Sequence, residues 1–120
     1  MSKLVKGRDG ERRAEEFLKS RGYEVIGRNV RGPRGEIDLV ARRAGRMVFC
    51  EVKNWDGMPE EGLEQSIDRR KRRRIIHTAK SFLARNPEYI GGRMSFDVIF
   101  ISCGLSRLKH IENAFGENDD

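Results

Sequence analysis

Residues 35–53 decide the fold of this chain and read Gly-Glu-Ile-Asp-Leu-Val-Ala-Arg-Arg-Ala-Gly-Arg-Met-Val-Phe-Cys-Glu-Val-Lys. Charged and apolar side chains alternate at both ends of the stretch, a pattern typical of β-strands. The break between the two ends, residues 42–46, contains Gly45 and is short enough for a tight turn. The stretch is therefore predicted to be a β-hairpin with strands over residues 35–41 and 47–53.

The register of this hairpin follows from the residue numbers. A turn centred between Ala44 and Gly45 pairs residues whose numbers sum to 89, so Asp38 lies opposite Glu51. Successive side chains of a strand point to opposite faces, which places Lys53 on the face of Glu51. The first strand should then carry two sets of side chains, Glu36, Asp38 and Val40 on one face and Ile37, Leu39 and Ala41 on the other.

Two opposed carboxylates are an unusual feature for a hairpin. Their Cβ atoms lie roughly 5 Å apart, and they repel unless a cation lies between them or one takes up a proton. Asp38, Glu51 and the neighbouring Lys53 therefore predict a divalent-metal site with a cationic neighbour. Oxygen-only ligands suit Mg²⁺ or Mn²⁺ better than Zn²⁺. The alternative is that these charges form the solvated face of an edge hairpin.

The same residues resemble a nuclease motif. Asp38 matches the first acid of the PD-(D/E)xK motif and Glu51-Val52-Lys53 matches its E-x-K, although Ile37 stands where proline would precede the acid. More closely, the chain is identified as a member of the YraN family, small bacterial proteins regarded as endonucleases and similar to archaeal Holliday-junction resolvases. The features that carry this resemblance are Gly10-Glu11, Ala14, Leu18, Gly22-Tyr23, Asn29, residues 35–39, Phe49, the E-x-K, Lys71 and Phe96-Asp97-Val98.

The resemblance implies a metal-dependent DNA endonuclease. Asp38 and Glu51 would hold Mg²⁺, Glu11 would complete the carboxylate set directly or through water, and Lys53 would assist the reaction. Glu36 and Gln65 are accessory candidates. The resemblance also implies branched or otherwise structured DNA as the substrate and a homodimer as the active form. The alternatives are a non-catalytic nucleic-acid-binding domain that keeps the fold, and an interaction protein with no nucleic-acid role.

Composition agrees with a polyanionic partner. The 120 residues are enough for one domain with a single core. Charged and hydrophobic residues each make up 37% of the chain, so the apolar residues must be concentrated in a few elements. The net charge of +6 favours nucleic acid as the partner. No apolar run reaches membrane-spanning length and none resembles a signal peptide, so a cytoplasmic protein is expected.

Arginines gather in two segments that could contact phosphates. A loop predicted over residues 30–35 carries Arg31 and Arg34, and a helix predicted over residues 63–85 contains an unbroken basic run. The members of that run considered for nucleic-acid binding are Arg69, Arg70, Lys71, Arg72 and Arg73. Six consecutive helical residues sample all directions around the axis, and Lys71 is predicted to point toward the sheet or cleft. The alternative is a solvated basic helix.

The remaining segments complete the predicted fold. A helix is expected over residues 9–20, capped by Asp9 and ended by Gly22. Strands are expected over residues 23–29, 94–102 and 108–115, with flexible ends at 1–8 and 116–120. The chain is thus predicted to be a single α+β domain, an α/β sandwich around a mixed sheet in the order α-β-β-β-α-β-β. The resemblance implies a restriction-endonuclease-like core.

Overall fold

The computed structural model describes residues 3–56, 66–102 and 107–117 of the chain. Within these ranges the predicted order of helices and strands is confirmed, with one short 3-10 helix added between α2 and β4. The elements are α1 (Lys3–Ser20), β1 (Glu24–Gly32), β2 (Gly35–Arg43), β3 (Arg46–Asn54), α2 (Arg69–Arg85), η3 (Pro87–Tyr89), β4 (Arg93–Ser102) and β5 (Arg107–Phe115).

The strands form one mixed sheet in the order β1-β2-β3-β4-β5. Only β3 and β4 run parallel, while the other neighbouring pairs are antiparallel. The predicted register of the central hairpin is confirmed from the pair Arg43–Arg46 to the pair Leu39–Cys50, whose numbers sum to 89. The ladder ends there, so it does not include the predicted pair of Asp38 with Glu51. The hairpin and β4 therefore form the centre of the sheet.

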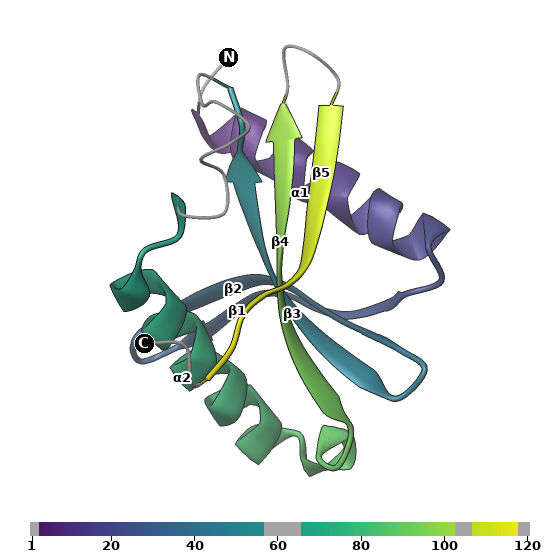
Figure 1. The fold of residues 1–120 in the computed structure, drawn as a ribbon, viewed down its shortest axis with the longest axis vertical. Coiled ribbons are helices and arrows are strands. Elements are labelled where there is room, and N and C mark those ends of the chain that lie inside the picture. The colour runs from purple at the N-terminus through teal and green to yellow at the C-terminus, as the bar shows by residue number, and fades with distance from the viewer. Residues whose placement is uncertain (1–2, 57–65, 103–106, 118–120) are drawn as a thin grey trace.

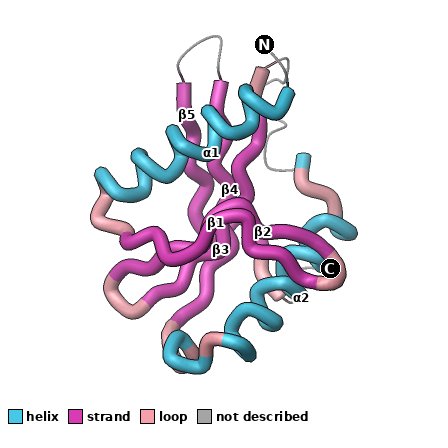
Figure 2. The backbone as a smooth tube through the Cα atoms, turned by 180° about the vertical axis from the view of Figure 1, so that it is seen from behind, coloured by secondary structure: helices cyan, strands magenta, loops and turns pink. Residues whose placement is uncertain are grey.

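The two helices cover opposite faces of the sheet (Figures 1 and 2). One apolar cluster joins α2 to the sheet through residues such as Ile75, Phe82 and Phe49. The other joins α1 to the sheet through residues such as Leu18 and Cys50. This layering confirms the predicted sandwich. No helix within the described ranges is long and apolar enough to cross a membrane.

One side chain of the hairpin lies on the face opposite to the predicted one. Ile37 was predicted to share a face with Leu39 and Ala41, but it packs in the α2 cluster, whereas the other two pack in the α1 cluster. The ladder between β2 and β3 ends at Leu39, and Ile37 pairs only with Val30 of β1. Val30, the partner of Ile37 in β1, packs against the α2 cluster as well, and the preceding residue, Asn29, has a positive φ of 48°.

Both helices begin at positions other than those predicted. Helix α1 begins at Lys3, so Asp9 lies inside the helix, where it pairs with Arg12 at 2.8 Å instead of capping the end. Helix α2 begins at Arg69 because Asp68 caps it and accepts a hydrogen bond from the backbone N–H of Lys71 at 2.9 Å. Part of the predicted helical stretch, residues 57–65, lies outside the described residues.

The predicted end of α1 is confirmed by its hydrogen bonds. Gly22 has a φ of +88°, its N–H donates to the carbonyl of Lys19, and the N–H of Tyr23 donates to the carbonyl of Leu18. This pattern is the Schellman motif that glycine favours. By contrast, the loop predicted over residues 30–35 is only a turn at 33–34, because β1 continues to Gly32.

Candidate active site

Asp38 and Glu51, called here the acidic pair, lie where the ladder between β2 and β3 ends. The Asp38 carboxylate takes the place of a backbone partner, since its Oδ2 accepts a hydrogen bond from the N–H of Val52 at 2.7 Å. Val52 directly follows Glu51 in β3. This hydrogen bond fixes the Asp38 carboxylate against the backbone that carries Glu51.

The surroundings of the acidic pair disfavour its negative charge. Burial, and then the charge of Glu51, raise the pKa of Asp38 to about 7, while the bond from Val52 acts in the opposite direction. Burial also raises the pKa of Glu51, although Lys71 and Lys53 oppose the shift. Carboxylates crowded in this way are stabilised by a bound cation or proton.

Two lysines flank Glu51. The Nζ of Lys71 lies 3.2 Å from Glu51 Oε1, and the Glu51 side chain is 9% exposed. Lys71 therefore reaches the sheet, as predicted. Lys53 donates from Nζ to the backbone carbonyl of Ser66 at 2.9 Å, and its charge still lowers the pKa of Glu51.

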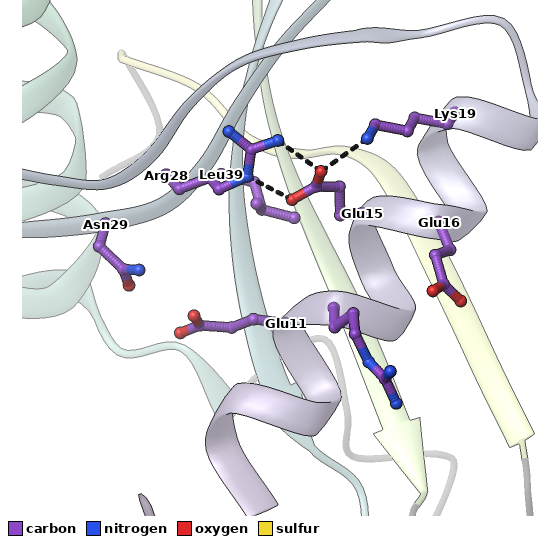
Figure 3. A pocket seen from close by; sticks show the side chains of 8 residues that line it. Glu11, Glu15, Glu16, Lys19, Arg28, Asn29 and Leu39 are labelled. Carbon is purple, nitrogen blue, oxygen red and sulfur yellow. Dashed lines mark hydrogen bonds and ion pairs between the residues drawn. The ribbon is translucent and has the colours of Figure 1, made fainter. Parts of the chain in front are cut away.

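Glu11 approaches the acidic pair from α1. Its charge helps to raise the pKa of Asp38, and it lines a cavity of about 280 Å³ between α1 and the strands β1 and β2. Figure 3 shows Glu11 projecting toward Asn29 of β1. Asn29 has a positive φ of 48°, a conformation that asparagine tolerates better than most residues. The sequence pattern predicts no site role for Asn29.

Glu15, one turn after Glu11 in α1, is held by two basic side chains. Glu15 accepts hydrogen bonds from Arg28 at 2.5 and 2.6 Å and pairs with Lys19 at 2.8 Å (Figure 3). The hydrogen bond from Arg28 is the main reason that the pKa of Glu15 falls to about 2. Glu15 is thus a charged anchor between α1 and β1, which the sequence pattern did not reveal.

Arginines from the β1–β2 turn and from α2 form a second feature. They line a pocket of about 450 Å³, called here the basic pocket, made by Pro33, Arg34, Arg70, Arg73 and Arg74. The turn and helix come close because Gly35 has no side chain: a Cβ there would lie 3.3 Å from Cβ of Arg74. The structure thus brings together three of the predicted phosphate contacts, Arg34, Arg70 and Arg73, and adds Arg74, the last residue of the basic run.

The other predicted phosphate contacts are placed differently. Arg72 donates from Nε to the carbonyl of Ile67 at 2.8 Å and lies over the ring of Phe115, so part of its role is structural. Arg69 is exposed but does not line the basic pocket. The side chain of Arg31 is 82% exposed and lies 3.7 Å from Glu36.

The donor set is compatible with Mg²⁺. Within the described ranges no three acidic, histidine or cysteine side chains form a ready-made metal site. However, Mg²⁺ keeps several waters and is commonly held by one or two carboxylates, which the acidic pair supplies. Of the two accessory candidates, Glu36 lies 3.7 Å from Arg31, and Gln65 lies outside the described residues.

Comparison with known sequences places this arrangement in a family. The sequence model of "Uncharacterised protein family UPF0102" matches residues 10–101. A UPF0102 protein of Persephonella marina is 37% identical over 115 residues, covering 96% of this chain and 97% of the relative. One from Lachnoclostridium phytofermentans is 41% identical over 117 residues, covering 96% of each chain. These names state no activity.

Proposed function

We propose that this chain, which belongs to the uncharacterised protein family UPF0102, is a metal-dependent endonuclease that hydrolyses phosphodiester bonds in DNA. The observation that carries the proposal is the acidic pair: Asp38 and Glu51 lie on neighbouring strands, share raised pKa values and are flanked by lysines. The fold is proposed to be a restriction-endonuclease-like core with the PD-(D/E)xK motif at residues 38 and 51–53.

The acidic pair would hold the metal ion, with Glu11 contributing directly or through water. A bound Mg²⁺ or Mn²⁺ would polarise the scissile phosphodiester and lower the pKa of an attacking water. The protein's own contribution begins before substrate arrives, because the Val52 N–H and the packing around Glu51 hold both carboxylates in place. Holding the ligands in advance removes an ordering cost from catalysis.

Lys53 and Lys71 would act on negative charge near the acidic pair. Lys53 is tied to the Ser66 carbonyl, so its ammonium has a defined position from which to stabilise charge that develops on the phosphate. Lys71 pairs with Glu51. We propose that Lys71 keeps Glu51 ionised and gives up part of this contact when a metal ion binds.

The basic pocket would bind the DNA backbone. Arg34, Arg70, Arg73 and Arg74 surround one hollow, and guanidinium groups bind phosphate oxygens in a bidentate manner. Arg31 and Arg69 would extend this surface. Such contacts position the duplex without reading its sequence. Structured DNA as the substrate, and a homodimer, are proposed from the family resemblance alone.

The Lys71–Glu51 ion pair favours a second candidate. If the acids served only to anchor α2 on the sheet, the protein would be a non-catalytic DNA-binding domain. The two candidates share the basic pocket but differ in the need for Glu51 and Lys53. They can therefore be separated with variants at these two positions.

The test is a cleavage assay on single-stranded, duplex, flap and four-way DNA with Mg²⁺, Mn²⁺ or EDTA. We expect Glu51→Gln and Lys53→Ala each to abolish cleavage while DNA binding and the unfolding transition are retained. Glu24→Gln is the matched control, because Glu24 lies in β1 and makes an exposed pair with Arg42. Full cleavage by either site variant would exclude this active site. A wild-type protein that binds DNA but cleaves none of the four substrates would support the second candidate.

A further inference from the structure

Three arginines lie side by side at the turn end of the central hairpin, away from the acidic pair. Arg43 of β2 pairs with Arg46 of β3, and Arg46 pairs in turn with Arg93 of β4. Paired residues on neighbouring strands point to the same face. We propose that these three arginines form a phosphate-binding site, which goes beyond the proposed nuclease function.

A pocket of suitable shape accompanies the arginines. A hollow of about 430 Å³, called here the hairpin pocket, is lined by Tyr23, Arg43, Ala44, Gly45, Arg46, Gly91, Gly92 and Arg93. Three of these residues are cationic and none is acidic. A hollow that presents cations without a counter-charge is suited to an anion with several oxygens, as a phosphate group has.

The hairpin pocket is built in a fixed shape. Arg43 donates from Nη1 to the carbonyl of Arg21 at 2.7 Å, and its guanidinium lies over the ring of Tyr23, 4.2 Å from the centroid. This hydrogen bond uses one of the five N–H donors of the guanidinium. The side chain of Arg43 is thus held in place while donors remain for a ligand.

The backbone of Gly45 and Gly92, which also line the hairpin pocket, is closely packed. A Cβ at Gly92 would lie 2.3 Å from the carbonyl oxygen of Gly45, so only glycine fits there. The same carbonyl accepts a hydrogen bond from the N–H of Arg93 at 3.2 Å. These contacts hold the start of β4 against the hairpin turn, and they hold Arg93 beside Arg46.

The acids around the hairpin pocket have partners other than its three arginines. Glu24 pairs with Arg42, and Glu112 accepts a hydrogen bond from the hydroxyl of Tyr23 at 3.4 Å. Asp97 is buried and bonds to Ser95 and His110. Like charges at directly paired positions destabilise a sheet. Arg46 is paired with Arg43 on one side and with Arg93 on the other, and no acid is among the residues that line the hairpin pocket. A bound phosphate would remove this repulsion.

The hairpin pocket is separate from the candidate active site. Arg46 begins β3, and Glu51 follows five residues later, which at about 3.3 Å per residue is roughly 17 Å along the strand. Val48 packs in the α1 cluster, and Arg46, two residues earlier in β3, lies on the same face by alternation, whereas Glu51 contacts Lys71 of α2. In Figure 1 the hairpin turn lies at the opposite end of β3 from its arrowhead. One phosphate could not reach both sites.

The experiment measures binding of inorganic phosphate and of pyrophosphate by calorimetry at constant ionic strength in chloride. We expect saturable binding to wild type, weakened roughly tenfold or more by Arg46→Gln and by Arg93→Gln, the loss expected for one charge-assisted hydrogen bond. If one of these two variants fails to fold, the other still tests the site. Arg12→Gln is the control with the same charge change, since Arg12 pairs with Asp9 on the surface of α1.

A second arm identifies the source of the phosphate. Binding to duplex DNA is measured against salt concentration for Arg46→Gln combined with Arg93→Gln. If the phosphate belongs to the DNA backbone, the slope should fall by about 0.9 for each lost contact. If it belongs to a small phosphate compound, pyrophosphate binding is lost while the slope is unchanged.

Two outcomes would overturn the proposed site: no saturable phosphate binding by wild type, or equal binding by wild type, Arg46→Gln and Arg93→Gln. Neither outcome bears on cleavage, because Glu51→Gln should bind phosphate at the hairpin pocket as wild type does. Failure of this site and failure of the nuclease proposal are therefore distinguishable.

Discussion

Replacing Asp38 with asparagine should stabilise the metal-free protein at alkaline pH. Burial and the charge of Glu51 raise the pKa of Asp38 from 3.8 to about 7. The folded protein thus binds a proton that the unfolded chain has already lost, and this contribution to stability is fully present below about pH 4. It is lost as the pH rises through about 7. Above that pH, the folded state carries a disfavoured negative charge that Asp38→Asn removes.

The size of the effect follows from the pKa. At about 1.4 kcal/mol for each tenfold change in proton affinity, the rise of the pKa from 3.8 to about 7 corresponds to at most about 4.5 kcal/mol. Because Asp38 and Glu51 titrate together, we expect a gain of about 2–4 kcal/mol. An asparagine side chain can still accept the hydrogen bond from the N–H of Val52, so the local geometry should be kept.

The assay is urea unfolding at pH 4 and pH 8 with EDTA. Asp38→Asn should unfold at higher urea than wild type at pH 8, and the difference should nearly vanish at pH 4. Asp9→Asn serves as the control, since Asp9 makes an exposed pair with Arg12 that is worth less than about 1 kcal/mol. If Asp38→Asn were no more stable than wild type at pH 8, the acidic pair would not be electrostatically strained and the argument for a cation site there would fail. Adding Mg²⁺ should reduce the difference in stability between Asp38→Asn and wild type at pH 8, because only wild type offers the ion both carboxylates of the acidic pair.

Three further predictions concern the groups around the acidic pair. Lys71→Ala should lower the free energy of unfolding at pH 8 by roughly 1 kcal/mol, since Glu51 loses its ion pair. Mg²⁺ should raise the melting temperature of this variant more than that of wild type. Equal rises in melting temperature would contradict the proposed exchange of Lys71 for metal. Arg73→Gln, in the basic pocket, should reduce the salt dependence of duplex binding by about 0.9 in slope, and an unchanged slope would assign Arg73 to solvation. Glu11→Gln should lower the pKa of Asp38, measured by carbon NMR of the carboxyl group, because the charge of Glu11 raises that pKa; it should also weaken Mg²⁺ binding and cleavage. A pKa unmoved by Glu11→Gln would place Glu11 outside the site.

Local patterns in the sequence determined the central hairpin. Alternation with a period of two identified both strands, and a short break with Gly45 fixed a register that the ladder from Arg43 to Leu39 confirms. The same reasoning placed Lys71 toward the sheet and ended α1 at Gly22. These features are predictable because side-chain direction and turn conformation depend on residues within a few positions of one another.

The tertiary structure decided what depends on distant segments. Parallel pairing of β3 with β4 brings Arg93 beside Arg46, although they are far apart in the sequence. Beyond the end of the ladder, Ile37 packs in the α2 cluster, and packing of the β1–β2 turn on α2 brings Arg34 and Arg74 to one pocket. A periodic pattern gives the direction of a side chain relative to its own strand or helix. Its neighbours across the sheet depend on strand order, twist and helix position, which burial of the two apolar clusters fixes for the whole chain at once.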